Sequence, residues 1–231
     1  MSDELLPAVP LLVARDGAVP LGGTGFFVEM SGVQYLVTAA HVPVGTWPTA
    51  DWSKWADRLT LGVDGMPTVS LFADSAFGRR PRFHFLRSSD DSNKLVDVIA
   101  LPCAPQDLGI DTFRVFSTKA VVPDLDKDVT AFGYATNVPA WPEGSARGGQ
   151  IICDDQAFLV ANLDTPEGFS GGPVTSAAGS LIGVLVGQGR PGLEDSHDRI
   201  VVVGIVDILP QLKDGILPPH ASVPFFPPPV N

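Results

Sequence analysis

The residues with the clearest potential for chemistry are residues 168–174, with the sequence GFSGGPV. A serine hydroxyl becomes a nucleophile when a base accepts its proton and hydrogen-bond donors receive the charge that develops on the substrate oxygen. Glycines on both sides of Ser170 allow a sharp turn that directs the backbone N–H groups of Gly168 and Ser170 toward one point. The motif therefore predicts a serine nucleophile beside an oxyanion hole.

Two other residues are of the types that activate such a serine. His41 follows the run YLVTAA (35–40), where a strand would end in small residues. An imidazole held at such a point can act as a general base. Asp97 lies inside the apolar run LVDVIAL (95–101), and a buried carboxylate is costly unless it is paired. An imidazole N–H would pair with it and fix the tautomer of the ring. His41, Asp97 and Ser170 thus form a candidate triad.

The segment around Ser170 also fits the Gly-x-Ser-x-Gly pattern of α/β-hydrolases, in which the serine opens a helix and the acid and histidine follow it in sequence. Here the serine is followed by GGPVT, which is a poor start for a helix. No βαβ pattern precedes it, so we exclude this alternative. The four histidines and two cysteines have no zinc-ligand spacing, and we predict no metal or other cofactor.

Apolar side chains alternate with period two along most of the chain, which predicts β-strands. We therefore expect strands to position these residues. The candidate strands are 11–14, 24–30, 34–40, 68–73, 82–87, 95–103, 113–117, 128–134, 150–153, 157–163, 173–175, 180–187 and 200–205. The 24 glycines and 22 prolines also favour many short elements joined by turns, and predict an all-β protein built as two packed barrels or a large sandwich. Residues 206–213 predict one short helix.

Composition limits the classes of partner. The formal net charge of −11 leaves no basic stripe for a phosphate backbone, so we expect no nucleic-acid partner. No apolar run approaches the roughly 18 residues of a membrane span, so we expect no membrane partner. The N-terminal residues lack the features of a secretory signal, and two cysteines cannot form a disulfide framework. These features predict a cytoplasmic protein.

Taken in chain order, the motifs resemble those of the chymotrypsin/trypsin-like serine peptidases. The matching segments are GTGFFV (23–28), YLVTAAHV (35–42), DVIAL (97–101), GFSGGPV (168–174) and LIGVLVGQG (181–189). The likeness extends over residues 9–210. It is closer to minimal bacterial trypsin-like peptidase domains, many of them intracellular and attached to stress-response or defence systems, than to the secreted digestive enzymes.

The resemblance implies two antiparallel six-stranded β-barrels with the active site in the cleft between them. Residues 1–116 would form the N-terminal barrel with the histidine and aspartate, and 117–127 the linker. Residues 128–217 would form the C-terminal barrel with the serine and a short C-terminal helix. From 218 to 231 the chain is a proline-rich tail.

The resemblance also implies roles for single residues. His41 would be the general base, Asp97 its orienting carboxylate and Ser170 the nucleophile, and the amides of Gly168 and Ser170 would form the oxyanion hole. A strand formed by Val186, Gly187 and Gln188 would pair with an extended substrate backbone.

Two positions near the nucleophile bear on activation and specificity. Phe169 stands where the digestive enzymes carry an aspartate that captures a newly cut N-terminus. Asp164, six residues before Ser170, falls where the family has the base of the specificity pocket. A carboxylate there would favour Arg or Lys before the cut bond.

The sequence thus predicts a cofactor-independent serine endopeptidase that acts on polypeptides through an acyl-enzyme, with a regulatory protein partner as an open expectation. Two alternatives remain: an esterase on the same scaffold, and a catalytically silent or partner-gated binding module.

Overall fold

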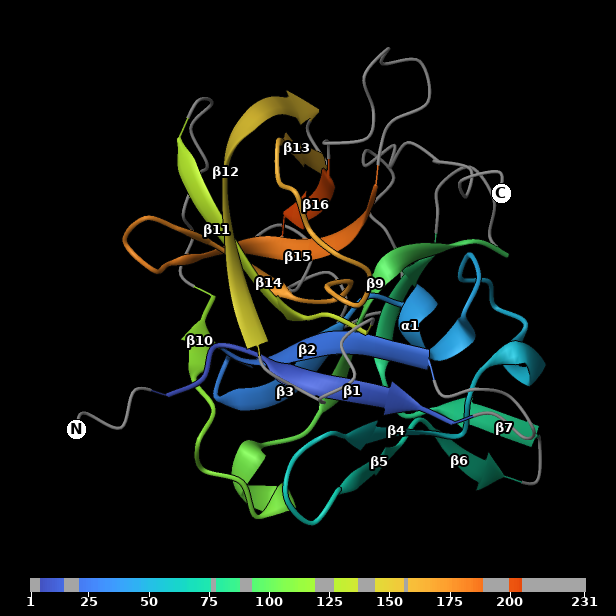
Figure 1. Cartoon of the computed structure of the whole chain (residues 1–231). Coiled ribbons are helices and arrows are strands. Elements are labelled where there is room, and N and C mark those ends of the chain that lie inside the picture. Colours follow the sequence, from blue (N-terminus) through green and yellow to red (C-terminus); the bar gives the residue numbers. More distant parts are fainter. Residues whose placement is uncertain are drawn as a thin grey trace.

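Two large β-sheets pack against each other in the described part of the chain, and a two-stranded hairpin accompanies the first (Figure 1). The computed structural model describes residues 5–14, 21–75, 78–87, 93–118, 127–136, 144–155, 158–188 and 200–204. The predicted helix at 206–213, the proline-rich tail and most of the predicted linker lie outside these residues.

The first half holds ten strands and the short helices. The strands are β1 (Val9–Val13), β2 (Leu21–Met30), β3 (Val33–Thr38), β4 (Arg58–Leu61), β5 (Thr68–Ser70), β6 (Phe72–Ser75), β7 (Gly78–Pro81), β8 (His84–Arg87), β9 (Leu95–Pro102) and β10 (Val115–Ser117). The helices are α1 (His41–Val44) and the 3-10 turns η1 (Trp52–Lys54) and η2 (Pro105–Leu108). One sheet runs in the order β5-β4-β1-β2-β3-β9-β8, with β10 parallel to β2, and β6 and β7 form a separate hairpin.

The second half is a closed barrel in the order β11-β12-β13-β16-β15-β14. Its strands are β11 (Asp128–Tyr134), β12 (Gly144–Asp155), β13 (Phe158–Ala161), β14 (Pro173–Ser176), β15 (Leu181–Gln188) and β16 (Ile200–Gly204). The predicted all-β, double-barrel fold class is confirmed. In detail the first sheet has eight strands instead of six, because short strands extend it at both ends and β10 adds to β2.

Alternating apolar residues place a core inside each half. Phe26, Leu36 and Ile99 are fully buried in the first core, and Val174 and Leu185 belong to the second. Strand β15 contributes to both cores: Leu185 belongs to the second, whereas Leu181, Val184 and Val186 pack with the first. The two sheets therefore meet through apolar contacts, with β11 against β2 and β15 against β9.

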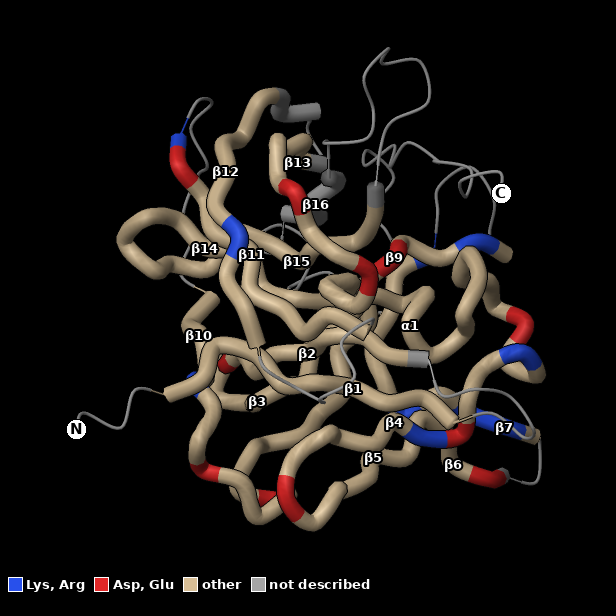
Figure 2. Tube along the Cα trace, viewed as in Figure 1, with Lys and Arg blue, Asp and Glu red and all other residues tan. Residues whose placement is uncertain are grey.

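An aromatic cluster supports the segment after α1. Trp55 stacks on Phe83 with ring centroids 5.0 Å apart, and the Arg79 guanidinium lies 3.9 Å from the centroid of Phe72. Arg79 also donates to the carbonyl oxygen of Trp52 (2.8 Å). This arginine belongs to β7, which carries much of the basic charge in the lower right of Figure 2. The cluster thus ties the β6–β7 hairpin to the body.

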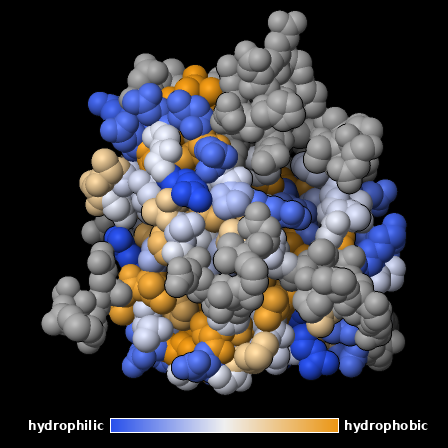
Figure 3. Space-filling model, viewed as in Figure 1, coloured by the Kyte–Doolittle hydropathy of each residue, from blue (hydrophilic) through white to orange (hydrophobic). Residues whose placement is uncertain are grey.

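No helix in the described ranges is both long and apolar enough to cross a bilayer. On the face drawn in Figure 3, hydrophilic and hydrophobic residues are intermixed.

Candidate active site

His41 is placed by the end of β3. The strand ends at Thr38, and the fully buried Ala39 and Ala40 lead directly into α1, which begins at His41. The serine loop lies against this turn, since a Cβ at Gly171 would come within 2.8 Å of the Ala39 backbone nitrogen. The His41 side chain is partly buried, with 28% of its surface exposed.

Asp97 lies in β9, which is buried on both faces, and its side chain is only 4% exposed. Its Oδ2 lies 2.7 Å from the His41 Nδ1, and its Oδ1 accepts the backbone N–H of His41, also at 2.7 Å. One residue therefore satisfies both carboxylate oxygens. The structure thus brings His41 and Asp97 together, and the arrangement fixes the orientation of the ring.

Two opposing effects set the pKa of His41. Burial of the ring is the largest single effect and lowers the pKa, but the charge of Asp97 and its hydrogen bond together raise it by more. The net result is a pKa above the ordinary value of 6.5. The carboxylate thus strengthens the imidazole as a base.

Ser170 lies in the loop between β13 and β14 and is half-buried. Its carbonyl oxygen accepts the backbone N–H of Thr24 in β2 (2.9 Å). At the next residue, Gly171, φ is +87°, and a Cβ would overlap the carbonyl oxygen of Thr24 and the hydroxyl of Thr38. Only glycine allows this approach. The loop therefore docks directly on the strand that leads to His41.

The peptide between Glu167 and Gly168 is held by its carbonyl. The Glu167 oxygen accepts the backbone N–H of Thr136 at 3.0 Å and its hydroxyl at 3.4 Å. The N–H and C=O of a trans peptide point in opposite directions, so the Gly168 N–H points away from Thr136.

The peptide between Phe169 and Ser170 is held in the same way. The Phe169 carbonyl accepts the N–H of Gly172 at 2.9 Å, which turns the Ser170 N–H to the other side. Within the described residues, neither the Ser170 N–H nor the Gly168 N–H donates a hydrogen bond. The loop thus leaves two donors available beside the serine.

Phe169 anchors the loop in the second core. The side chain is 1% exposed and lies against the backbone of β11, where a Cβ at Gly133 would come within 2.6 Å of the ring. The phenylalanine thus fixes the loop through apolar packing at the position before the serine.

Replacing Phe169 by Ala should destabilise the protein by about 3–5 kcal/mol, because it empties a fully buried aromatic site. Urea unfolding of the wild type, Phe169→Ala and Phe169→Leu measures this. The leucine variant is the control, since it keeps most of the apolar volume, and it should lose clearly less. Equal losses in the two variants would contradict the packing role.

The remaining predicted site residues lie in two places. Asp164 is exposed, in the segment between β13 and the serine loop. Gly187 and Gln188 pair with β16, whereas the pairing of β15 with β14 ends at Val184. On that side of β15, residues 186–188 have no strand partner among the described residues.

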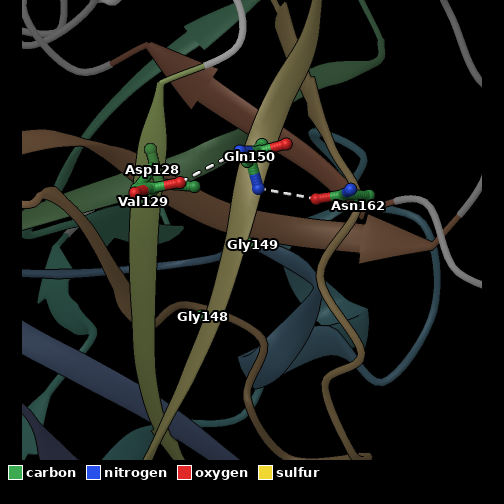
Figure 4. A pocket seen from close by; sticks show the side chains of 6 residues that line it. All are labelled: Asp128, Val129, Gly148, Gly149, Gln150 and Asn162. Carbon is green, nitrogen blue, oxygen red and sulfur yellow. Dashed lines mark hydrogen bonds between the residues drawn. The ribbon is translucent and has the colours of Figure 1, made fainter.

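A surface cavity of about 470 Å³ lies elsewhere on the second barrel (Figure 4). Figure 4 shows its polar wall, where Gln150 donates from Nε2 to Asp128 (3.0 Å) and from its backbone N–H to Asn162 (2.6 Å). None of the predicted site residues lines this cavity.

The threonines that support the loop were missed by sequence reasoning. Thr24 and Thr38 are fully buried, and Thr136 caps the Glu167 carbonyl. The available signal was a hydroxyl within an otherwise apolar strand, as in GTGFF (23–27) and LVTAA (36–40). Buried hydroxyls require partners, but the sequence does not say which carbonyl accepts.

Comparisons with known proteins agree with this architecture. The sequence profile of the trypsin-like peptidase domain family matches residues 23–184. No curated protein gives a significant match.

Solved structures of low sequence identity share the fold. The serine endoprotease from Yersinia pestis is 18% identical (TM-score 0.58; 92% of this chain and 65% of that chain covered). The active form of the Rv3671c protease from M. tuberculosis is also 18% identical (TM-score 0.55; 96% and 87%). The HtrA-type protease AlgW, solved with a tripeptide, is 16% identical (TM-score 0.58; 92% and 60%). The chain thus spans less than two thirds of the first and third of these proteins. Because the family profile matches most of the chain, the protein belongs to the trypsin-like peptidase domain family, and so to the chymotrypsin/trypsin-like serine proteases.

Proposed function

We propose that the protein is a serine endopeptidase that cleaves polypeptides through an acyl-enzyme intermediate. His41 is the general base, Asp97 its orienting carboxylate and Ser170 the nucleophile. The observation that carries the proposal is the hydrogen-bonded Asp97–His41 pair. The serine loop docks beside it, against β2 and the end of β3.

The ring nitrogens of His41 have separate tasks. We assign to Nδ1 the proton that is shared with Asp97 across the 2.7 Å contact, which leaves Nε2 unprotonated and able to accept the proton of the Ser170 hydroxyl. The serine oxygen then bonds to the substrate carbonyl carbon. As that intermediate collapses, the peptide C–N bond breaks and His41 returns the proton to the leaving amine. Water repeats the sequence and releases the acid.

The charge on the substrate oxygen needs donors that are already in place. The N–H groups of Gly168 and Ser170 supply them, because the carbonyls of their peptides are engaged by Thr136 and Gly172. Donors held in this way need no reorganisation during the reaction, and each is worth about two orders of magnitude in kcat. The edge of β15 at Val186, Gly187 and Gln188, which does not pair with β14, would hold the substrate backbone.

Activity should fall at acidic pH with an apparent pKa above 6.5, because the base must be neutral and the pKa of His41 is raised. The pH profile of kcat/KM tests this. The free energy of unfolding should change in the opposite sense. Because the pKa of His41 is raised in the folded state, the protonated ring stabilises the fold; this stabilisation is fully present below pH 6.5 and is lost as the pH rises through the folded-state pKa. An NMR titration of His41 in the Ser170→Ala variant reports the same group without turnover. A ring pKa below 6.5 would contradict both expectations.

We propose that the enzyme cuts after Arg or Lys, with Asp164 as the favoured partner of the cation. Since Asp164 is exposed, the ion pair should be worth at most about 1 kcal/mol, or roughly fivefold in kcat/KM. A library of fluorogenic peptides varied at the residue before the cut, read with wild type and Asp164→Asn, tests this. A preference for small apolar or acidic residues that Asp164→Asn leaves unchanged would contradict it.

The location and partners follow from the sequence argument. We propose a cytoplasmic enzyme with a polypeptide substrate, without nucleic-acid or membrane partners, that acts in a bacterial stress-response or defence system under a regulatory protein. Composition, charge and the family resemblance support this.

Incubation with an unfolded protein such as casein, followed by mass spectrometry of the products, tests the function. We expect new internal termini with the wild type and none with Ser170→Ala. Hydrolysis of simple esters without peptide cleavage would favour the esterase. A folded wild type that hydrolyses neither would favour the silent or gated binding module.

A further inference from the structure

Thr24 has an unusual concentration of contacts for a residue in the middle of a strand. It is 0% exposed and joins segments more than a hundred residues apart. Its hydroxyl donates to the Gly168 carbonyl (2.8 Å) and accepts the Tyr134 N–H (3.1 Å). Its backbone N–H donates to the Ser170 carbonyl (2.9 Å), and its own carbonyl accepts the Thr38 hydroxyl (2.7 Å).

These contacts hold the serine loop on both sides of Phe169. The Gly168 carbonyl belongs to the peptide between the two free N–H donors, and the Ser170 carbonyl belongs to the peptide that follows the nucleophile. Thr24 therefore fixes the two ends of the segment that carries the donors and the serine. Phe169, between them, points into the second core.

The same strand position also contacts the structure that carries His41. A Cβ at Gly23 would come within 2.7 Å of Val42, the residue after the histidine. The Thr38 hydroxyl, which holds the Thr24 carbonyl, comes from the last residue of β3. A short chain of contacts thus runs from the His41 turn through Thr24 to the serine.

We propose that Thr24 is a positioning residue that sets the distance and orientation of Ser170 and its oxyanion donors relative to His41. The inference rests on the proposed function. Without the hydroxyl, the Gly168 carbonyl and the Tyr134 N–H would lose their partner in a buried site. The loop would then shift, and a displacement of about 1 Å at a reacting group can cost roughly 100-fold in rate.

The experiment compares the wild type with Thr24→Val, Thr24→Ser and Thr175→Val in hydrolysis of one peptide substrate. Valine keeps the shape and the backbone N–H but removes the hydroxyl, whereas serine keeps the hydroxyl. Thr175 is the matched control because its hydroxyl donates to the Thr130 carbonyl wholly within the second barrel. Thermal unfolding of each variant shows that the assay temperature lies below its transition.

We expect Thr24→Val to lower kcat by roughly 10- to 100-fold with little change in KM, Thr24→Ser to restore most of kcat, and Thr175→Val to keep the wild-type kcat. Thr24→Val with unchanged kcat would overturn the inference, as would an equal loss in Thr175→Val or no rescue by serine. If Thr24→Val does not fold, Thr24→Ala, which also removes the hydroxyl but introduces no new methyl group, replaces it against the same Thr24→Ser comparison. An unchanged kcat in Thr24→Ala would equally overturn the proposal.

The outcomes separate this inference from the proposed function. A wild type that neither hydrolyses peptides nor reacts with a fluorophosphonate overturns both. An active wild type whose kcat does not depend on the Thr24 hydroxyl overturns the positioning role alone.

Discussion

Ser170→Ala and His41→Ala should each lower kcat/KM by roughly five to six orders of magnitude, and the double variant should lose little more. The serine is a weak nucleophile without the base, and the base has no proton to accept without the serine, so the two act as one unit. What remains should come from substrate binding and the two N–H donors. Steady-state hydrolysis of one peptide by all three variants measures the effect.

Ser176→Ala is the control for replacing a serine in the same barrel, since among the described hydrogen bonds its hydroxyl takes part in one alone, accepting the Ser180 N–H (3.3 Å). It should keep wild-type activity. Losses in the double variant that equal the product of the single losses would show that Ser170 and His41 act independently.

Asp97→Asn should lower kcat/KM by about 10⁴-fold while the fold is kept. The amide can still accept the His41 backbone N–H through its oxygen. Its NH₂ group would face Nδ1 and favour the tautomer with the proton on Nε2, which cannot accept the serine proton. Peptide hydrolysis and circular dichroism of the purified variant measure activity and folding together.

Asp107→Asn gives the matched control, since that exposed carboxylate accepts only the Ala104 N–H (3.2 Å) among the described hydrogen bonds. It should leave kcat/KM unchanged. Activity within tenfold of wild type in a folded Asp97→Asn protein would remove the orienting role assigned to Asp97.

The strands that were predicted best are those with strict alternation or a continuous apolar run. Residues 24–30, 95–103 and 128–134 fall within or overlap β2, β9 and β11, because their faces are set by burial on at least one side. Strands in the first half are harder to predict. The single strand predicted at 68–73 divides into β5 and β6 at the buried Leu71, whose backbone N–H donates to the Asp57 carbonyl and whose carbonyl accepts the Arg82 N–H.

Strand β12 shows the same limit in the second half. The prediction began at Gln150, whereas the strand begins at Gly144. Glycines weaken the local strand signal, yet the two rings of Phe132 and Tyr134 lie close over Gly144, where a Cβ would come within 2.6 Å of the first and 2.8 Å of the second. Such close packing between strands is a tertiary property.

The chemistry of the site was more accessible from the sequence than its support. Asp97 could be singled out because a carboxylate in an apolar run needs a partner, and the structure pairs it with His41. The roles of Thr24 and Thr136 could not be derived, because both act on main-chain carbonyls brought to them by folding. The exposure of Asp164 depends likewise on the path of the loop.

Reaction with a fluorophosphonate, followed by mass spectrometry of the labelled peptide, tests the central claim most directly. The probe bonds only to a serine that a base has activated beside oxyanion donors. We predict one adduct per chain in the wild type, located on Ser170, and none in Ser170→Ala or His41→Ala. An adduct that persists in Ser170→Ala, or a folded wild type that does not react, would contradict the account.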